Sequence, residues 1–350
     1  MEEQDRPIQT RDDHTVVIGF FRPEDAPGIA ALFRAVYGEH YPIRIYYDPE
    51  ALIRANAGGD CCSIVARNES GQVVGATHAV RSSPYKGIYE SAAGLVLGTY
   101  RNQGINNRLQ WFLFYRWAPT IPGIAGIFGE PVCQHIHLQK NWHELGAVEV
   151  GLEVALMPAN AYQDKKEGQD RVACMAAYWP VVHRPHRVYL PDVYAKALGF
   201  LYSGLNEERA FSPSVEALPT DRRTERRIKI FDFASIVRVN FQETGADLQE
   251  SVEKMEGEAR CSGVKVIQVW LKLGLPWVGA AVDVFRANGY FLGGLLPRWF
   301  DKDGLLMQKL FCPPEWEGIQ VYTERAERIF EIVRKDLCSV VSLLARKAAN

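Results

Sequence analysis

The sequence predicts an α/β protein of two domains, each built from alternating strands and helices, followed by a C-terminal amphipathic helix. Three observations predict this fold class. The 350 residues exceed the size at which a single hydrophobic core usually stops growing. Segments with strand and helix patterns alternate along the chain. Landmarks of the first half also return, in the same order, in the second half.

The composition narrows the class of protein further. The chain is 47% hydrophobic and 23% charged, which is typical of a globular protein. Its net charge of -2 argues against a nucleic-acid binder, which needs an excess of lysine and arginine. No apolar run reaches membrane-spanning length, and Met1–Arg6 lacks the apolar stretch of a secretory signal. Seven cysteines without a spacing pattern indicate reduced thiols, so we expect a cytoplasmic protein.

The elements of the first half follow from local patterns. Val16–Phe21 is β-branched and aromatic, which predicts a strand, and Asp25 before Ala26-Pro27 is typical of a helix start. Proline at 119 and glycine at 146 end two later helices. The other predicted elements of this half are strands over 62–66, 73–80, 89–97, 124–129 and 148–156, and helices over 105–117 and 135–145.

The second half begins after Asn160–Asp170, a polar segment without periodicity that is typical of an interdomain linker. A helix is predicted to open at Tyr189–Tyr194, and a polar loop covers 206–225. Glu324–Lys347 has one apolar face and is predicted to be the amphipathic helix. The other predicted elements are strands over 228–233, 236–241, 264–271, 290–296 and 305–311, and helices over 248–261 and 277–288.

Three pairs of landmarks recur at nearly one offset. Arg101-x-x-Gly104 returns as Gln242-x-x-Gly245 after 141 positions, the helix-ending Gly146 returns as Gly289 after 143, and Pro158 returns as Pro297 after 139. We therefore predict a duplicated αβ domain. The predicted limits are a first domain over 1–160, a linker over 161–173, a second domain over 174–315 and a C-terminal helical region over 316–350.

One segment, Gly94–Asn106, carries a pattern with chemical meaning. A strand, an Arg-x-x-Gly turn and a helix direct successive backbone N–H groups outward at a helix N-terminus, which favours an anion such as a pyrophosphate. No acidic residue occurs from Gln103 to Ala118. An ordinary strand-to-helix turn is the alternative. In the second copy, Glu243, Asp247 and Glu250 lie in or beside the first turns and would repel a pyrophosphate, so we expect one cofactor site, in the first half.

These segments resemble the GNAT family of N-acetyltransferases. The resemblance covers about residues 15 to 158, through Phe21–Ala26, Gly94–Asn106 and Trp142–Gly146, and a diverged second copy is similar at Ala287–Gly294. It implies a mixed sheet splayed open near its middle, with acetyl-CoA or another acyl-CoA in the splay. It also implies direct transfer of a short acyl group to a small-molecule or peptide amine. The residues that it implies for the acyl-CoA are Leu95, Val96 and Leu97 at the pantetheine arm, and Gln103, Gly104, Ile105, Asn106 and Asn107 at the pyrophosphate, with Arg101 and Asn102 as further cofactor-binding residues of the loop.

The sequence departs from the family pattern at three positions. Asn106 replaces the last small residue of the loop, and Gly98 replaces the usual proline. Trp142 stands where a tyrosine often serves as general acid, and an indole cannot donate a proton at a useful pKa. Asn106 and Trp142 therefore keep open a catalytically silent CoA-sensing or scaffold module. An aminoacyl-tRNA-dependent transferase of similar fold is a further alternative.

Two residues are candidates for proton transfer. Glu90 lies on the long strand before the loop, near the position of a general-base glutamate in some members, although an exposed strand glutamate is the plain alternative. His135, at the start of a helix, is the second candidate. The spacing of Cys133, His135 and His137 fits no common zinc site, so no metal is expected. Tyrosines at 37, 41, 46 and 47 are candidates to wall the acceptor pocket, and the C-terminal helix either packs on its own domain or joins a homodimer.

Overall fold

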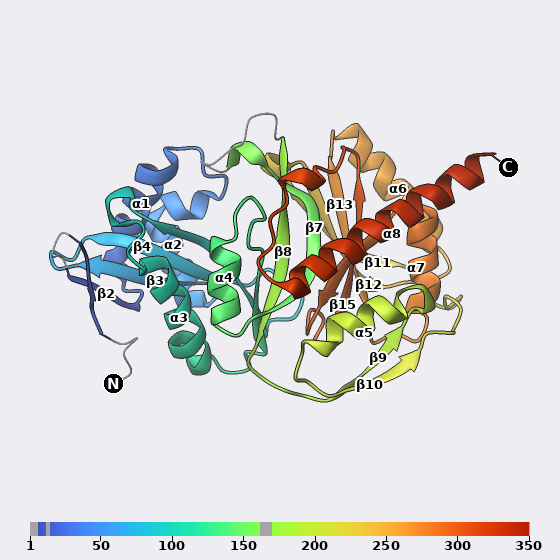
Figure 1. Ribbon diagram of the computed structural model, residues 1–350, viewed down its shortest axis with the longest axis horizontal. Helices are drawn as coiled ribbons and strands as arrows, with labels where there is room; N and C mark the ends of the chain where they lie inside the picture. The colour runs from blue at the N-terminus through green and yellow to red at the C-terminus, as the bar shows by residue number, and fades with distance from the viewer. Residues whose placement is uncertain (1–5, 12–14, 162–169, 350) are drawn as a thin grey trace. The chain divides into compact units, whose positions relative to one another are not determined.

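The computed structural model describes residues 6–11, 15–161 and 170–349 of the chain. They form two compact units, and each is considered by itself. The first unit comprises Met1–Gly129 with Trp179–Val182, and the second comprises Glu130–Tyr178 with His183–Asn350. In Figure 1 the first unit is mostly blue to teal and the second mostly green to red.

The strands of the first unit follow one another in the order β1-β2-β3-β4-β5-β6. Neighbouring strands are antiparallel except for β5 and β6, which are parallel. Valine and isoleucine recur in these strands among small residues such as alanine and glycine, and most of β3 and β4 is buried. Their bounds are β1 (Ile8–Gln9), β2 (Thr15–Phe20), β3 (Cys61–Asn68), β4 (Val73–Val80), β5 (Ile88–Val96) and β6 (Gly126–Gly129).

Helices cover both faces of this sheet. On one face lie α1 (Ala26–Tyr37) and α2 (Pro49–Gly58), and on the other lies α3 (Ile105–Phe112), which continues as a wider turn to Trp117. Adjacent residues of β4 show the two faces, because successive side chains of a strand point in opposite directions. His78 contacts the Phe33 ring of α1, with ring centroids 6.0 Å apart, whereas Thr77 Oγ1 accepts a hydrogen bond from Gln110 Nε2 of α3 at 3.1 Å.

The second unit holds a mixed sheet in the order β8-β7-β14-β15-β13-β12-β11, with β12 and β13 parallel. Strands β9 and β10 form a separate parallel pair. The strands are β7 (Val148–Pro158), β8 (Arg171–Pro180, in this unit as far as Tyr178), β9 (His186–Leu190), β10 (Arg209–Pro213), β11 (Glu225–Phe231), β12 (Ile236–Glu243), β13 (Val266–Lys272), β14 (Phe291–Leu296) and β15 (Gly304–Leu310). The helices are α4 (His137–Glu144), α5 (Ala195–Ser203), α6 (Leu248–Cys261), α7 (Val278–Ala287) and α8 (Glu324–Ala349).

The order of elements recurs along the chain. Strand β5 is followed by α3, β6, α4 and the antiparallel pair β7 and β8, and strand β12 is followed by α6, β13, α7 and the antiparallel pair β14 and β15. In each series the strand before the first helix pairs in parallel with the strand after it. This recurrence is what the landmark offsets predict, while the domain limits drawn from them stay a prediction.

The fold class is confirmed, because the chain forms a mixed α/β structure with helices against large mixed sheets. The segment expected as a linker, 161–173, lies partly outside the described residues, and its last part, Arg171–Ala173, begins strand β8. The loop expected over 206–225 contains strand β10. Among the described residues, no helix combines the length and apolar character that a membrane span needs.

Candidate functional site

The sheet of the first unit opens beyond Glu90. Strands β5 and β6 pair only from Ile88–Glu90 to Gly126–Phe128, yet β5 continues to Val96. Its pairing with β4 shifts register between Ala76 and His78, and Ala93 adopts a φ of 51° opposite the shift. A bulge of this kind re-aims the backbone of a strand. The outer half of β5 therefore turns one edge toward the gap left by β6.

The amide of Val96 is directed to this open edge. Leu97 donates its own amide to Val74 O of β4 at 2.9 Å, and amides of successive strand residues point to opposite edges. Val96 O also accepts a hydrogen bond from Arg101 Nε at 3.1 Å, which ties the loop to the end of the strand. Of the three residues expected along a pantetheine arm, Leu97 thus has its amide engaged within the sheet.

The loop between β5 and α3 leaves a helix N-terminus open. Asn102 and Gly104 have φ values of 60° and 76°, the left-handed conformation that glycine adopts without strain. A Cβ added at Gly104 would meet nothing within 4 Å. Ile105, Asn106 and Asn107 follow as the first turn of α3, whose amides have no acceptor inside the helix. The first turn carries no acidic residue, so the site has the partial positive charge that binds anions.

Asn106 does not obstruct this loop. Its Oδ1 would lie 3.4 Å from a Cβ placed at Gly94 of β5, so the side chain reaches back toward the strand. Gln110, one turn later, bonds Ser91 Oγ and Thr77 Oγ1 at 2.9 and 3.1 Å and fixes the helix on the sheet. The unusual asparagine therefore packs on a glycine of β5 and leaves the mouth of the turn free.

The corresponding turn of the second unit is filled by the chain itself. Gly245 donates its amide to Thr224 Oγ1 at 3.1 Å, and Ala246 donates its amide to Pro219 O at 3.0 Å. A Cβ added at Gly245 would lie 2.8 Å from the carbonyl carbon of Arg222. Asp247 Oδ1 closes the contact by accepting the amide of Thr224 at 2.8 Å. No anion has room at this turn, and its amides are already bonded.

Glu90 and the tyrosines form one cluster in the first unit. Burial raises the pKa of Tyr41, and the negative charge of Glu90 raises it further. Burial is also the main cause that raises the pKa of Tyr46, with Glu90 among the smaller ones. For Tyr37, burial raises the pKa while the charge of Arg101 opposes it. The rings of Tyr37 and Tyr41 lie 4.9 Å apart. Tyr47 joins them, because its hydroxyl accepts the Tyr41 amide at 3.0 Å, so the structure brings together the predicted base, Arg101 of the predicted loop and all four predicted pocket tyrosines.

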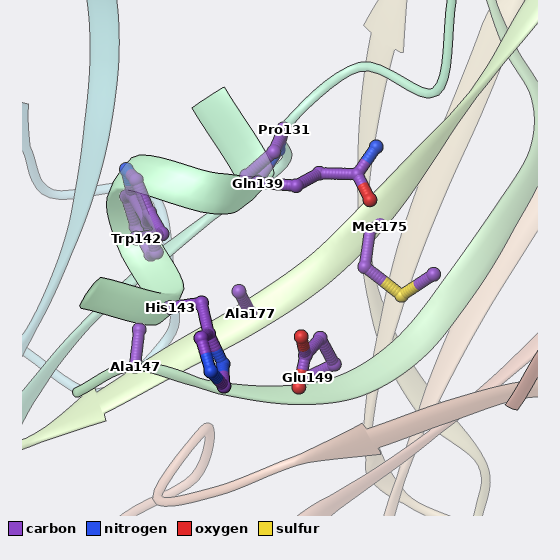
Figure 2. A pocket seen from close by; sticks show the side chains of 8 residues that line it. All are labelled: Pro131, Gln139, Trp142, His143, Ala147, Glu149, Met175 and Ala177. Carbon is purple, nitrogen blue, oxygen red and sulfur yellow. The ribbon is translucent and has the colours of Figure 1, made fainter. Parts of the chain in front are cut away.

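His135 belongs to the second unit, unlike Glu90. It precedes α4, and its ring lies 5.0 Å from that of His137. Trp142, in the position of the missing tyrosine, is 2% exposed and lines a pocket between α4 and strands β7 and β8 (Figure 2). This pocket is a shallow surface feature, too small to enclose a CoA molecule. The residues lining it are Pro131, Gln139, Trp142, His143, Ala147, Glu149, Met175 and Ala177.

Sequence reasoning did not anticipate the geometry of two parts of the site. The bulge at Ala93 places an alanine at positive φ, which no composition rule anticipates. The filled turn at Gly245 depends on a loop that comes more than twenty positions earlier. In the part of the chain that the structure describes, no three His, Cys, Asp or Glu side chains gather as a metal ion would require.

No protein-family model matches this chain, and no curated protein matches it. The solved structures that it resembles over about half its length are GNAT-family N-acetyltransferases. One is a chimera of spermidine N-acetyltransferase SpeG from Vibrio cholerae and hSSAT, at 13% identity and a TM-score of 0.37, covering 47% of this chain and 95% of that one. An N-acetyltransferase from Staphylococcus aureus shows 14% identity and a TM-score of 0.37, covering 47% and 98%. An acetyltransferase of the GNAT family from Streptococcus pneumoniae shows 14% identity and a TM-score of 0.39, and the match covers 47% of this chain and 99% of that one. Identities and TM-scores this low describe a similarity of backbone fold and say nothing of substrate or mechanism.

Proposed function

We propose that the chain is an N-acyltransferase that moves an acetyl or other short acyl group from acyl-CoA to an amine, in its first unit. The contrast between the two turns carries this proposal. Gly104 opens onto free space at an acid-free helix N-terminus, whereas Gly245 is covered by the backbone of Arg222. A pyrophosphate needs free amides and a close approach to the backbone, and the first turn offers both.

The gap beyond Glu90 suits the rest of an acyl-CoA molecule. The open edge of β5 offers the Val96 amide to a pantetheine arm, and the arm would run from the loop toward Glu90. Residues Gln103–Asn107 would hold the pyrophosphate on backbone amides, with Arg101 and Arg108 supplying positive charge. The tyrosines around Glu90 would then form the wall against which the amine is placed.

Glu90 is the proposed general base. Its carboxylate takes one proton from the acceptor ammonium, and the neutral amine nitrogen then attacks the thioester carbonyl carbon. The C–S bond breaks, an amide forms, and the second amine proton leaves with sulfur as the free CoA thiol. Because the transfer is direct, the protein contributes proximity, orientation and proton removal.

Release of free thiol from acetyl-CoA against a panel of amines tests the proposal. We expect thiol release with at least one class of amine, and we expect Glu90→Gln to lower kcat by about 100-fold or more, as loss of a general base does. Glu50→Gln is the matched control, because Glu50 is exposed on α2 of the same unit. Equal rates for Glu90→Gln and the unaltered protein would remove Glu90 from the mechanism.

A CoA-sensing module is the second candidate, and Trp142 favours it. Trp142 stands in the sequence where the resemblance implies a proton donor for the leaving thiolate, and an indole N–H does not supply that proton. Saturable binding of acetyl-CoA without thiol release toward any amine would support the sensor over the enzyme.

A further inference from the structure

The N-terminal segment of the chain lies against the predicted phosphate loop. Strand β1 pairs with β2 in antiparallel register, Ile8 opposite Val16 and Gln9 opposite Thr15, and this pairing anchors residues 6–11 on the edge of the sheet. Side chains add to the anchor, because Gln9 Nε2 donates to Thr15 Oγ1 at 3.2 Å. We call residues 6–11 the arm. It has a defined place in the first unit and is not a free tail.

Both ends of the arm are bonded to residues of the loop and its helix. The amide of Arg11 donates to Gln103 Oε1 at 2.9 Å, and Arg108 Nη1 donates to Arg6 O at 3.1 Å. Gln103 also bonds Thr99 O through Nε2 at 3.2 Å, so its side chain links the arm to the turn. Gln103 precedes Gly104 directly, and Arg108 lies one helical turn beyond it. The arm therefore runs beside the helix N-terminus where the phosphates are proposed to bind.

The arm brings positive charge to that place. Arg6 and Arg11 are both exposed, and neither forms a salt bridge within the described part of the chain. No carboxylate lies among residues 6–11. With Arg101 and Arg108, four guanidinium groups come from the arm, the loop and the first turns of α3. Arginine in such a position binds phosphate through charge-assisted hydrogen bonds.

We propose that the arm is part of the donor site, and that Arg6 and Arg11 bind the phosphates of CoA. This inference rests on the proposed function, because it concerns the same ligand. In that arrangement the pantetheine end of CoA lies along β5, away from the arm. Substituting these two arginines would therefore not change the binding of the pantetheine end. Their effect is thus specific for the nucleotide end of the ligand and sensitive to salt.

Calorimetric titration with CoA, dephospho-CoA and pantetheine tests the arm. We expect the double variant Arg6→Gln/Arg11→Gln to weaken CoA binding about five- to tenfold at low salt, and less at high salt. Binding of pantetheine, which has no pyrophosphate and no 3′-phosphate, is expected to stay unchanged. A smaller loss with dephospho-CoA than with CoA would assign the contact to the 3′-phosphate, and an equal loss would assign it to the pyrophosphate.

The matched control is Arg54→Gln, an exposed arginine of α2 in the same unit, which changes the net charge without touching the loop. The sequence around the arm is acidic, with Glu2, Glu3, Asp5, Asp12 and Asp13. If the arm instead competed with phosphate, deleting residues 1–11 would tighten CoA binding, and that result would overturn the inference. Unchanged CoA affinity of the double variant, or an equal loss for pantetheine, would also overturn it. Failure of the unaltered protein to bind CoA at all would overturn the proposed function as well.

Discussion

At the scale of single residues, two glycines of equivalent position have opposite surroundings. Gly104 needs its left-handed φ but has open space, whereas Gly245 is pressed against the Arg222 carbonyl. We expect Gly104→Ala to lower the free energy of unfolding by about 1 kcal/mol, from backbone strain alone. Gly245→Ala is expected to cost more than about 2 kcal/mol, because a backbone group must move. Urea denaturation measures both.

Gly199→Ala provides the control for these glycine substitutions. Gly199 lies within α5, and a Cβ there meets nothing within 4 Å. Alanine in a helix is favoured over glycine, so this variant is expected to be more stable by about 0.5 to 1 kcal/mol. A Gly245→Ala variant as stable as the unaltered protein would contradict the filled turn.

His78 of β4 is buried and neutral. Its Nδ1 lies 2.8 Å from Ser63 Oγ, and Asn56 Nδ2 donates to the same hydroxyl at 3.2 Å. The Ser63 hydroxyl thus bonds both the Asn56 amide and the His78 ring. Burial lowers the pKa of His78 from 6.5 to about 3. Between these values the unfolded chain binds a proton that the folded chain does not.

The free energy of unfolding is therefore expected to fall as the pH decreases from 6.5 toward 3. The size of the pKa shift limits the contribution of His78 to a few kcal/mol at most. His78→Phe removes the titrating group and is expected to flatten the profile in this window, at a cost of about 1 kcal/mol at neutral pH for the lost hydrogen bond. The free energy of unfolding, measured at several pH values, checks this. His40→Gln, an exposed change, is expected to keep the slope.

Of these residue-level features, the sequence predicts the open turn at Gly104 but not the covering of Gly245 or the burial of His78. The Arg-x-x-Gly spacing and the absence of acid after Gln103 depend on neighbours in the chain, so the open turn at Gly104 could be anticipated. The covering of Gly245 by Arg222 is a tertiary contact between loops, and only the acidic residues around it gave a hint. The burial of His78 next to Phe33 and Tyr46 also depends on the packing of α1 on the sheet.

At the scale of elements, β7 and β14 approach unusually closely. They meet at Gly151 and Gly294, and a Cβ at Gly151 would lie 2.6 Å from Gly293 O and 2.8 Å from Gly294 Cα. Only glycine permits this distance. We expect Gly151→Ala to destabilise the second unit by more than about 2 kcal/mol, because the two backbones must separate. Urea unfolding followed by the fluorescence of tryptophans such as Trp270 measures this, and the midpoint is expected at a lower urea concentration. An unshifted midpoint would contradict the close pairing.

The elements missed by sequence analysis lack strong local signals. Helix α2 is short, and of its residues only Leu52 is buried, so its apolar period is weak. It depends on Asp48, whose Oδ1 accepts the Ala51 amide at 3.0 Å, and on the left-handed Gly59. Strand β8 is almost wholly buried, and its alanines and cysteine do not alternate with polar residues. Strand β10 is largely exposed and pairs only with β9.

At the scale of the whole molecule, the recurrent order of elements could be predicted because it depends on the spacing of strand and helix patterns. The compact units are defined by contacts rather than by sequence order, and the domain limits drawn from the sequence stay a prediction. The first unit ends at Gly129 and regains Trp179–Val182, although the predicted first domain extends to 160. The order of elements in β5–β8 recurs in β12–β15, and a duplicated domain stays a prediction.

If the duplication left one working donor site, each chain binds one CoA. The turn at Gly245 has its amides bonded to Thr224 and Pro219, so a second molecule would have to displace the chain itself. Isothermal titration is therefore expected to give one site per chain. Gly104→Asp is expected to abolish that site, since a carboxylate at the mouth of the loop repels pyrophosphate and complements the helix dipole in its place. Gly257→Asp, in open space on α6, serves as the control for added charge. Two equivalent sites, or one site that survives Gly104→Asp, would show that CoA binds elsewhere and that the open turn is an ordinary strand-to-helix connection.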